Sequence, residues 1–187
     1  MSVIFVLALA VLSRILPVAF HQQSWGFSLM GGCLLFVGSR MGSGSPRRAA
    51  MQVAGVLAAL MATDYWMTVY GYGYPFHASS YLLTWAWYVG VCVASMGLLR
   101  KVTPVRVAAA AIATPTSFFL ISNFAVWMDG MYTHTLAGLG QSYVAGIPFY
   151  RNDLASTALT VVALFGLPAV AARLANSLDS TGNDMAA

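Results

Sequence analysis

Long apolar runs separated by short polar or basic segments dominate the pattern of the chain. The clear runs are Ala49–Val69, Tyr81–Leu99, Val107–Met128 and Leu154–Ala172. The last three contain no Asp, Glu, Lys or Arg, and the first contains a single acid, Asp64. A helix needs about 20 apolar residues to cross a hydrocarbon core of about 30 Å. Each run therefore predicts a membrane-spanning helix.

Two earlier runs are less regular. Ser2–Phe20 is apolar apart from Arg14, which lies near enough to its end to hold its charge at the interface. It has neither a basic leader nor a small-residue cleavage site, so we expect a retained span and not a signal peptide. Phe27–Gly38 is shorter, with a length that is also typical of a re-entrant segment. Extended to Trp25–Met41, it predicts a further span.

Basic residues set the expected orientation, because cytoplasmic loops of membrane proteins are rich in Lys and Arg. With six spans and the N-terminus inside, most of the basic residues face the cytoplasm: Arg40, Arg47, Arg48, Arg100, Lys101, Arg106 and Arg173. Omitting Phe27–Gly38 would keep those loops on one side, so charge alone does not decide the number of spans.

The predicted fold is therefore all-α. We expect the protein to lie in a bacterial inner membrane with both chain ends on the cytoplasmic side. The expected transmembrane domain covers residues 1–175, with helices at about 2–20, 25–41, 49–69, 81–99, 107–128 and 154–174. We expect the polar tail, residues 176–187, to be disordered. On the third helix, Ala50, Ala54, Ala58 and Ala62 form a ladder of small residues that would let another helix approach closely.

Composition excludes several functions. Of the 187 residues, 59% are hydrophobic and only 7% are charged, whereas soluble domains carry about 25% charged residues. The basic residues lie between apolar runs and not along one polar face, so we expect no nucleic-acid binding. Cys33 and Cys92 have no CxxC partner, which argues against a disulfide framework or zinc site. The loop Gly42–Arg48 lacks the GK[ST] ending of a phosphate-binding loop, and no catalytic set stands out, so we do not expect an enzyme.

The expected external loops, about Pro17–Gly26, Tyr70–Ser80 and Asp129–Asn152, are unlike the cytoplasmic ones. Aromatic residues crowd this side. An interfacial aromatic belt accounts for many of the rings, but not for their scarcity at the cytoplasmic ends. A wet, aromatic end of a helix bundle is typical of a ligand mouth. The candidate ligand-binding residues on this side are Tyr72, Tyr74, Phe76, His77, Ser79, Ser80, Trp85, Trp127, Tyr132 and Arg151.

Asp64 is the only acid well inside a predicted span. Intramembrane acids are costly and normally face the bundle interior and pair with another group. Asp64 is therefore either a contact to a ligand or gate, or a structural partner of Arg14 or Arg151. Asn123, with Ser122 beside it, presents the same choice. For Arg151 and Asp153 we expect a local ion pair at the start of the sixth helix.

Each external loop holds one histidine: His21, His77 or His134. For each one alone, a solvated loop side chain is the simpler interpretation. Together they could converge on a metal, or one could be an axial ligand to a metal macrocycle, because neutral imidazole binds transition metals. No HxxxH or HExxH spacing supports a preformed zinc site.

Two stretches carry a resemblance. SRILP followed by GFSLMGGCLLFVGSRM (Gly26–Met41), and FLISNFAVWMDGMYTHTLAGLGQSYVAGIPFYRNDL (Phe119–Leu154), resemble an uncharacterised family of small bacterial membrane proteins. That family looks like the substrate-binding S components of energy-coupling-factor (ECF) vitamin transporters. The resemblance implies six helices, a vitamin bound between external loops and helices four to six, and a coupling subunit with ATPases as partners.

Within that group, the solitary S components for vitamin B12 (the BtuM group) are similar in size. They ligate cobalt through a cysteine in the third loop, whereas this loop reads YGYGYPFHASSYLL, so His77 becomes the candidate axial ligand. The AxxxA patch that S components usually carry on helix one is absent here. This departure leaves docking to a standard coupling module open.

The resulting hypothesis is an uptake protein for a vitamin or cofactor, with cobalamin the leading substrate and no cofactor of its own. The alternative is a non-transporting packing subunit or assembly factor of a larger membrane complex.

Overall fold

The computed structural model describes residues 2–22, 27–41 and 45–186, with side chains up to Ser177, and this part of the chain contains helices and no strand. The first three helices are α1 (Val3–Ala19), α2 (Met30–Met41) and α3 (Pro46–Trp66), and α3 continues as a π-helical turn, η1 (Met67–Gly71). A 3₁₀ turn, η2 (Ala78–Tyr81), leads into α4 (Leu82–Leu98), which is followed by α5 (Pro104–Met128). The chain ends with α6 (Leu136–Val161), a second π-helical turn, η3 (Val162–Gly166), and α7 (Leu167–Ala186).

Side-chain caps mark the starts of three helices. The hydroxyls of Ser45, Thr103 and Thr135 accept hydrogen bonds from backbone N–H groups three residues further on, at 3.1–3.4 Å. Proline occupies the first position of α3 and of α5, where its missing N–H costs nothing. These local signals fix where α3, α5 and α6 begin.

Four helical segments are long and apolar enough to cross a membrane: Pro46–Gly71, Ala78–Leu98, Pro104–Met128 and Leu136–Ser177. Each overlaps one of the four clear apolar runs of the sequence, and the last begins well before its run, Leu154–Ala172. The helices α1 and α2 are apolar but shorter. The chain is therefore an all-helical protein whose long apolar helices suit a lipid bilayer.

The short helix α2 forms the centre of the bundle. It packs against α1, α4 and α6, and ten of its 12 residues are buried. Gly32 permits this packing, because a Cβ there would lie 2.5 Å from the Cβ of Thr160 on α6. At about 1.5 Å per residue, α2 is only about 18 Å long. A short element is tolerated at membrane depth where protein surrounds it on all sides.

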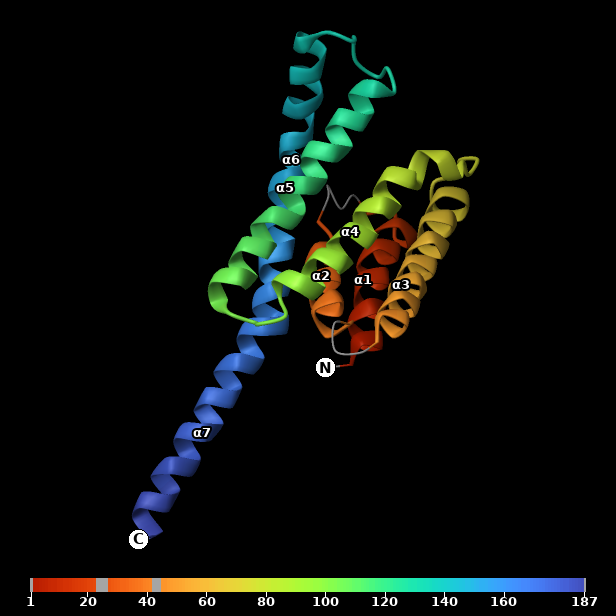
Figure 1. The fold of residues 1–187 in the computed structure, drawn as a ribbon. Coiled ribbons are helices and arrows are strands. Elements are labelled where there is room, and N and C mark those ends of the chain that lie inside the picture. The colour runs from red at the N-terminus through yellow and green to blue at the C-terminus, as the bar shows by residue number, and fades with distance from the viewer. Residues whose placement is uncertain (1, 23–26, 42–44, 187) are drawn as a thin grey trace.

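In Figure 1 the helices α1 to α6 run alternately up and down. The C-terminal ends of α2 and α4 and the N-terminal ends of α3 and α5 lie together at the lower end of the bundle. The paired helices α5 and α6 pack against each other and extend beyond the other helices at the upper end. Beyond η3, α7 extends away from the other helices (Figure 1).

Three sequence-based expectations about the last third of the chain are wrong. The expected external loop Asp129–Asn152 is short, because α6 begins at Leu136. Small residues of this stretch pack helix against helix: a Cβ on Gly146 would lie 2.5 Å from the Oδ1 atom of Asn123. The tail expected to be disordered is helical to Ala186.

The expected ion pair between Arg151 and Asp153 is the third error. The Arg14–Asp64 pair is the only ion pair among the residues with described side chains. Arg151 and Asp153 both lie inside α6, two positions apart. Residues at that spacing point to different faces of a helix, so they cannot meet.

Candidate functional site

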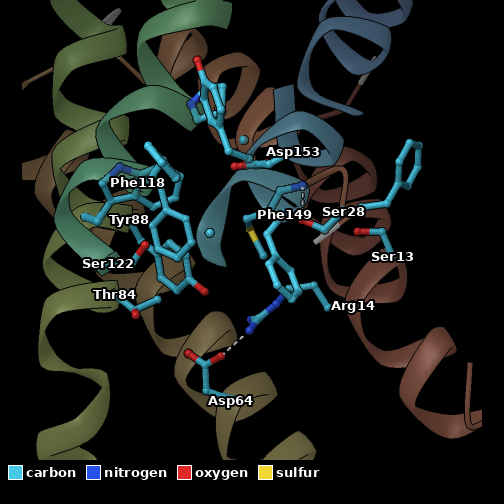
Figure 2. A pocket seen from close by; sticks show the side chains of 18 of the residues that line it. Ser13, Arg14, Ser28, Asp64, Thr84, Tyr88, Phe118, Ser122, Phe149 and Asp153 are labelled. Carbon is cyan, nitrogen blue, oxygen red and sulfur yellow. Dashed lines mark hydrogen bonds and ion pairs between the residues drawn. The ribbon is translucent and has the colours of Figure 1, made fainter. Parts of the chain in front are cut away.

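A cavity of about 460 Å³ lies among α1, α2, the end of α3, α4, α5 and α6. Its polar and charged lining residues are Ser13, Arg14, Ser28, Asp64, Thr84, Ser122, Asn123 and Asp153. The size falls within the range of about 300–1,000 Å³ that is typical of small-molecule pockets. In Figure 2, Thr84, Tyr88, Phe118 and Ser122 form one side of the cavity, and Ser13, Ser28 and Phe149 lie on the other.

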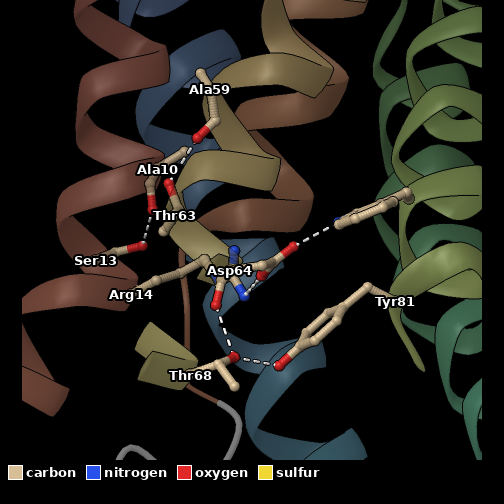
Figure 3. Close-up of polar contacts among 9 residues, drawn as sticks. Ala10, Ser13, Arg14, Ala59, Thr63, Asp64, Thr68 and Tyr81 are labelled. Atoms are coloured by element: carbon tan, nitrogen blue, oxygen red, sulfur yellow. Dashed lines mark hydrogen bonds and ion pairs between the residues drawn. The ribbon is translucent and has the colours of Figure 1, made fainter. Parts of the chain in front are cut away.

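At one end of the cavity Arg14 of α1 pairs with Asp64 of α3 (Figure 3). An Nη2–Oδ1 distance of 2.5 Å joins the two side chains, which are 17% and 1% exposed. The second carboxylate oxygen of Asp64 accepts a hydrogen bond from the indole N–H of Trp85 at 2.8 Å. Both oxygens of Asp64 are therefore occupied by protein donors. The structure selects Arg14, and not Arg151, as the partner of Asp64.

Hydrogen bonds also tie the backbone around this pair. The hydroxyl of Thr68 donates to the carbonyl of Asp64 at 2.7 Å, and the hydroxyl of Tyr81 lies 2.5 Å from that of Thr68. On α1, the Ser13 hydroxyl donates to the carbonyl of Ala10 and accepts from the backbone N–H of Leu29 just before α2. The charged pair thus lies where polar contacts join α1, α3 and α4 (Figure 3), and Ser13 also bonds the chain just before α2.

The Arg14 guanidinium is only partly satisfied. Its Nη1 atom is buried and has no hydrogen-bond partner among the described residues. The guanidinium carbon lies 6.0 Å from the ring centroid of Tyr88, which lines the same cavity. A charged donor group with an unused N–H can hold an acceptor atom of a ligand.

Asp153 of α6 lies at the other end of the cavity, apart from the Arg14–Asp64 pair (Figure 2). Thr157, one turn further along α6, donates a hydrogen bond to its carboxylate at the long distance of 3.5 Å. No described residue forms an ion pair with Asp153. The cavity thus has one compensated acid at one end and one uncompensated acid at the other.

Aromatic rings make up much of the remaining lining: Trp87, Tyr88, Phe118, Phe119, Phe149 and Tyr150. The ring centroids of Trp87 and Phe118 lie 4.8 Å apart, as do those of Phe119 and Tyr150. The Trp87 N–H bonds the hydroxyl of Ser117, and the Tyr150 hydroxyl bonds that of Thr116. These bonds hold the rings in place as apolar walls.

The sequence predicted only part of this lining. Of the candidate residues, Asp64, Tyr72 and Asn123 line the cavity. Trp85 does not line it but donates a hydrogen bond to the lining residue Asp64. Phe76 packs instead on Tyr81 in a stack that continues to Trp85. The others lie outside the lining: Tyr74, His77, Ser79, Ser80, Trp127, Tyr132 and Arg151.

The lining residues that sequence reasoning missed are Ser13, Ser28, Thr84 and Asp153 and the rings of α4, α5 and α6. A signal for Arg14 existed, since it is the one basic residue inside the first apolar run. Asp153 would have stood out in the sequence as a second intramembrane acid only if the sixth helix had been predicted to begin before it, as α6 does.

No set of three or more metal-ligating side chains occurs in the described part of the chain. His77 precedes η2, where its carbonyl accepts the N–H of Ser80 at 3.1 Å. His134 packs edge-on against Trp127 at the α5–α6 connection. His21 has a positive φ of 52° just after α1. A cobalt site at His77 stays a prediction.

Residues 1–178 match a protein family described as a family of unknown function, DUF6580. The chain belongs to this family. No curated protein and no solved structure matches it. The family description names neither ligand nor reaction, so the function of this DUF6580 chain has to be argued from its cavity.

Proposed function

We propose that the protein spans the bacterial inner membrane with six segments and captures a small molecule from the outside, as the binding step of vitamin or cofactor uptake. Both chain ends lie in the cytoplasm in this proposal. The basic residues Arg40, Arg47, Arg48, Arg100, Lys101 and Arg106 support this orientation, because they all belong to the helix ends and connections at the lower end of the bundle.

The observation that carries the proposal is a cavity lined by charged groups among long apolar helices. Ionisable residues inside membrane segments are costly and generally mark a pathway or a ligand site. Here Arg14, Asp64 and Asp153 all line one cavity of about 460 Å³. A purely structural ion pair would explain Arg14 and Asp64, but it would leave Asp153 without a role.

The residues of the cavity lining are suited to binding a ligand and not to its chemical conversion. Hydroxyl, amide and charged groups alternate with aromatic rings, and both oxygens of Asp64 are already engaged. We therefore propose a binding protein that works with an ATP-driven coupling subunit, as the resemblance to S components implies. The cavity volume favours a ligand smaller than cobalamin, because a corrinoid with its nucleotide loop far exceeds drug-sized molecules.

Thermal unfolding in nanodiscs, with and without water-soluble vitamins and cofactors including cobalamin, tests this proposal. A ligand at 100 times its Kd stabilises the folded state by about 2.7 kcal/mol. The variant Ser122→Phe fills the cavity and should abolish this stabilisation. Its matched control is Leu120→Phe, since Leu120 is 49% exposed on the same helix and does not line the cavity. Stabilisation that survives in Ser122→Phe would place ligand binding elsewhere.

A packing subunit of a larger membrane complex is the second candidate, and one observation favours it. The alanine ladder on α3, which the sequence predicts as a packing surface, is exposed at Ala50, Ala54, Ala58 and Ala62. In that case Ala58→Leu should release a partner chain from complexes extracted in native nanodiscs. Binding in the cavity would then be unaffected by the same substitution.

A further inference from the structure

The charges and donors of the cavity restrict the chemistry of its ligand. Arg14 and Asp64 compensate each other, because they form an ion pair at 2.5 Å. Asp153 lines the same cavity, and no described residue forms an ion pair with it. With Asp153 ionised, the lining carries one net negative charge, at the Asp153 end.

That charge disfavours an anionic ligand. The cavity lies among apolar helices, where an uncompensated carboxylate is costly. A second negative charge would add repulsion to this cost, whereas a cationic nitrogen near Asp153 would remove it. The Thr157 hydroxyl, at 3.5 Å, is too distant to satisfy the carboxylate well.

The walls favour the same kind of ligand. The rings of Tyr88, Phe118, Phe119 and Phe149 line the cavity. Aromatic faces attract cations through their electron-rich π-systems, and flat molecules stack on them. A flat cation gains from both effects, and a flat anion from only one.

The Arg14 end adds a requirement for an acceptor. The Nη1 group is buried and has no hydrogen-bond partner in the described chain, while Asp64 already occupies Nη2. An oxygen acceptor on the ligand would satisfy this donor. Because Asp64 neutralises the guanidinium charge, a neutral carbonyl oxygen is sufficient.

We propose that the ligand is a flat nitrogen-containing cation whose positive end lies at Asp153 and whose carbonyl-type oxygen accepts a hydrogen bond from Arg14 Nη1. This inference rests on the proposed function, since it assigns the ligand class of the same cavity. It excludes carboxylate and phosphate compounds without a cationic group as the preferred ligands.

Four matched pyridine probes test each element of this description. 1-Methylnicotinamide is flat and cationic and carries a carboxamide oxygen. Nicotinamide lacks the charge, N-methylpyridinium lacks the acceptor, and nicotinate is an anion. Ligand-observed saturation-transfer NMR with the protein in nanodiscs measures all four, including millimolar affinities. We expect 1-methylnicotinamide to bind about tenfold more tightly than each of the other three.

Variants assign each preference to a residue. Asp153→Asn should abolish the advantage of 1-methylnicotinamide over nicotinamide, because the negative charge is lost. Arg14→Lys retains the charge beside Asp64 but loses the second guanidinium nitrogen, so it should abolish the advantage over N-methylpyridinium. Arg151→Gln is the matched control for Asp153→Asn, since Arg151 lies on the same helix, is exposed and does not line the cavity.

The outcomes separate the two proposals. Tightest binding of nicotinate, equal binding of all four probes, or no binding of any of them would overturn the inference about ligand class. Binding of any probe that Ser122→Phe abolishes would still support the cavity as the binding site. Binding that Ser122→Phe leaves unchanged would overturn the proposed function itself.

Discussion

Two aspartates on apolar helices line the same cavity, but their surroundings differ. Asp64 has both oxygens occupied, by the guanidinium of Arg14 and the indole N–H of Trp85, and its side chain is 1% exposed. The Asp153 carboxylate accepts a single long hydrogen bond, from Thr157. The first arrangement is typical of a structural pair, and the second is typical of a group that awaits a partner from outside the protein.

This difference distinguishes an aspartate that stabilises the helix bundle from one that is available to a ligand. Arg14, Asp64 and Trp85 come from three helices, α1, α3 and α4, so their bonds connect elements distant in sequence. Asp153 and Thr157 both belong to α6, so their hydrogen bond does not join separate helices. Substitutions at Asp64 should therefore act on folding, and those at Asp153 on binding.

Removing the Asp64 carboxylate should give the largest effect. Breaking a buried ion pair on one side typically costs about 3–5 kcal/mol, because the remaining charge is left uncompensated. We expect Asp64→Ala to lower folding stability by this amount, and Asp64→Asn to lower it by about 1–3 kcal/mol since it retains hydrogen bonding. Unfolding by SDS titration measures both. Wild-type stability in both variants would remove Asp64 from the structural framework.

Replacing both members of the pair should reverse most of that loss. Buried ion pairs exchanged for apolar residues of similar size are often neutral or even stabilising. The double variant Arg14→Met with Asp64→Leu should therefore be more stable than Asp64→Ala, by about 2–4 kcal/mol. Its affinity for an acceptor-bearing ligand should nevertheless fall. A double variant as unstable as Asp64→Ala would show that the pair is required for folding itself.

An intermediate effect is expected where α2 packs on α6 close to Asp153. A Cβ on Gly32 would lie 2.5 Å from the Cβ of Thr160. Gly32→Ala should therefore cost about 1–3 kcal/mol, as overpacked cores do. Gly90→Ala on α4 is the control, since nothing lies within 4 Å of its Cβ position. That substitution should be neutral or stabilise by up to about 1 kcal/mol. Thermal unfolding distinguishes the two, and equal effects would argue against close α2–α6 packing.

The smallest effect on stability should come from Asp153. Because its carboxylate joins no two helices and lacks a partner charge, Asp153→Asn should not lower the folding stability of the ligand-free protein, and removal of the desolvated charge should if anything raise it. A loss comparable to that of Asp64→Ala, measured by the same SDS titration, would mean that Asp153 is structural after all. The contrast on which the ligand class depends would then disappear.

The sequence predicted the helices better than the cavity, for physical reasons. Uncharged runs such as Val107–Met128 can hardly be anything but long apolar helices, and α5 covers that run. The stretch from Leu136 to Asn152, which the sequence predicts as part of a loop, contains Gly138, Gly140, Gly146 and Pro148 and is nevertheless helical. In a tightly packed helix pair, small residues support the contact and do not signal a turn.

Most of the ligand-binding residues that the sequence predicts lie outside the cavity lining. Aromatic residues near the helix ends, such as Tyr74 and Trp127, suggested a mouth built from loops. The cavity lies deeper, between helices, and is lined by residues such as Thr84, Phe118 and Asp153. Sequence spacing cannot show which faces of six helices converge. The Arg14–Asp64 pair was foreseeable only because unpaired intramembrane charges are so costly.

The central claim is that the cavity opens to the outside and holds a ligand. Its most direct test is cysteine labelling of Ser122→Cys in intact cells with a membrane-impermeant maleimide, in a background where Cys33 and Cys92 are replaced by alanine. We expect labelling from the outside, slowed at least tenfold by saturating 1-methylnicotinamide, whereas labelling of Leu120→Cys should be unaffected by that compound. Labelling of Ser122→Cys only after the membrane is permeabilised would rule out an outward-opening cavity, and labelling that no ligand slows would rule out a ligand bound beside Ser122.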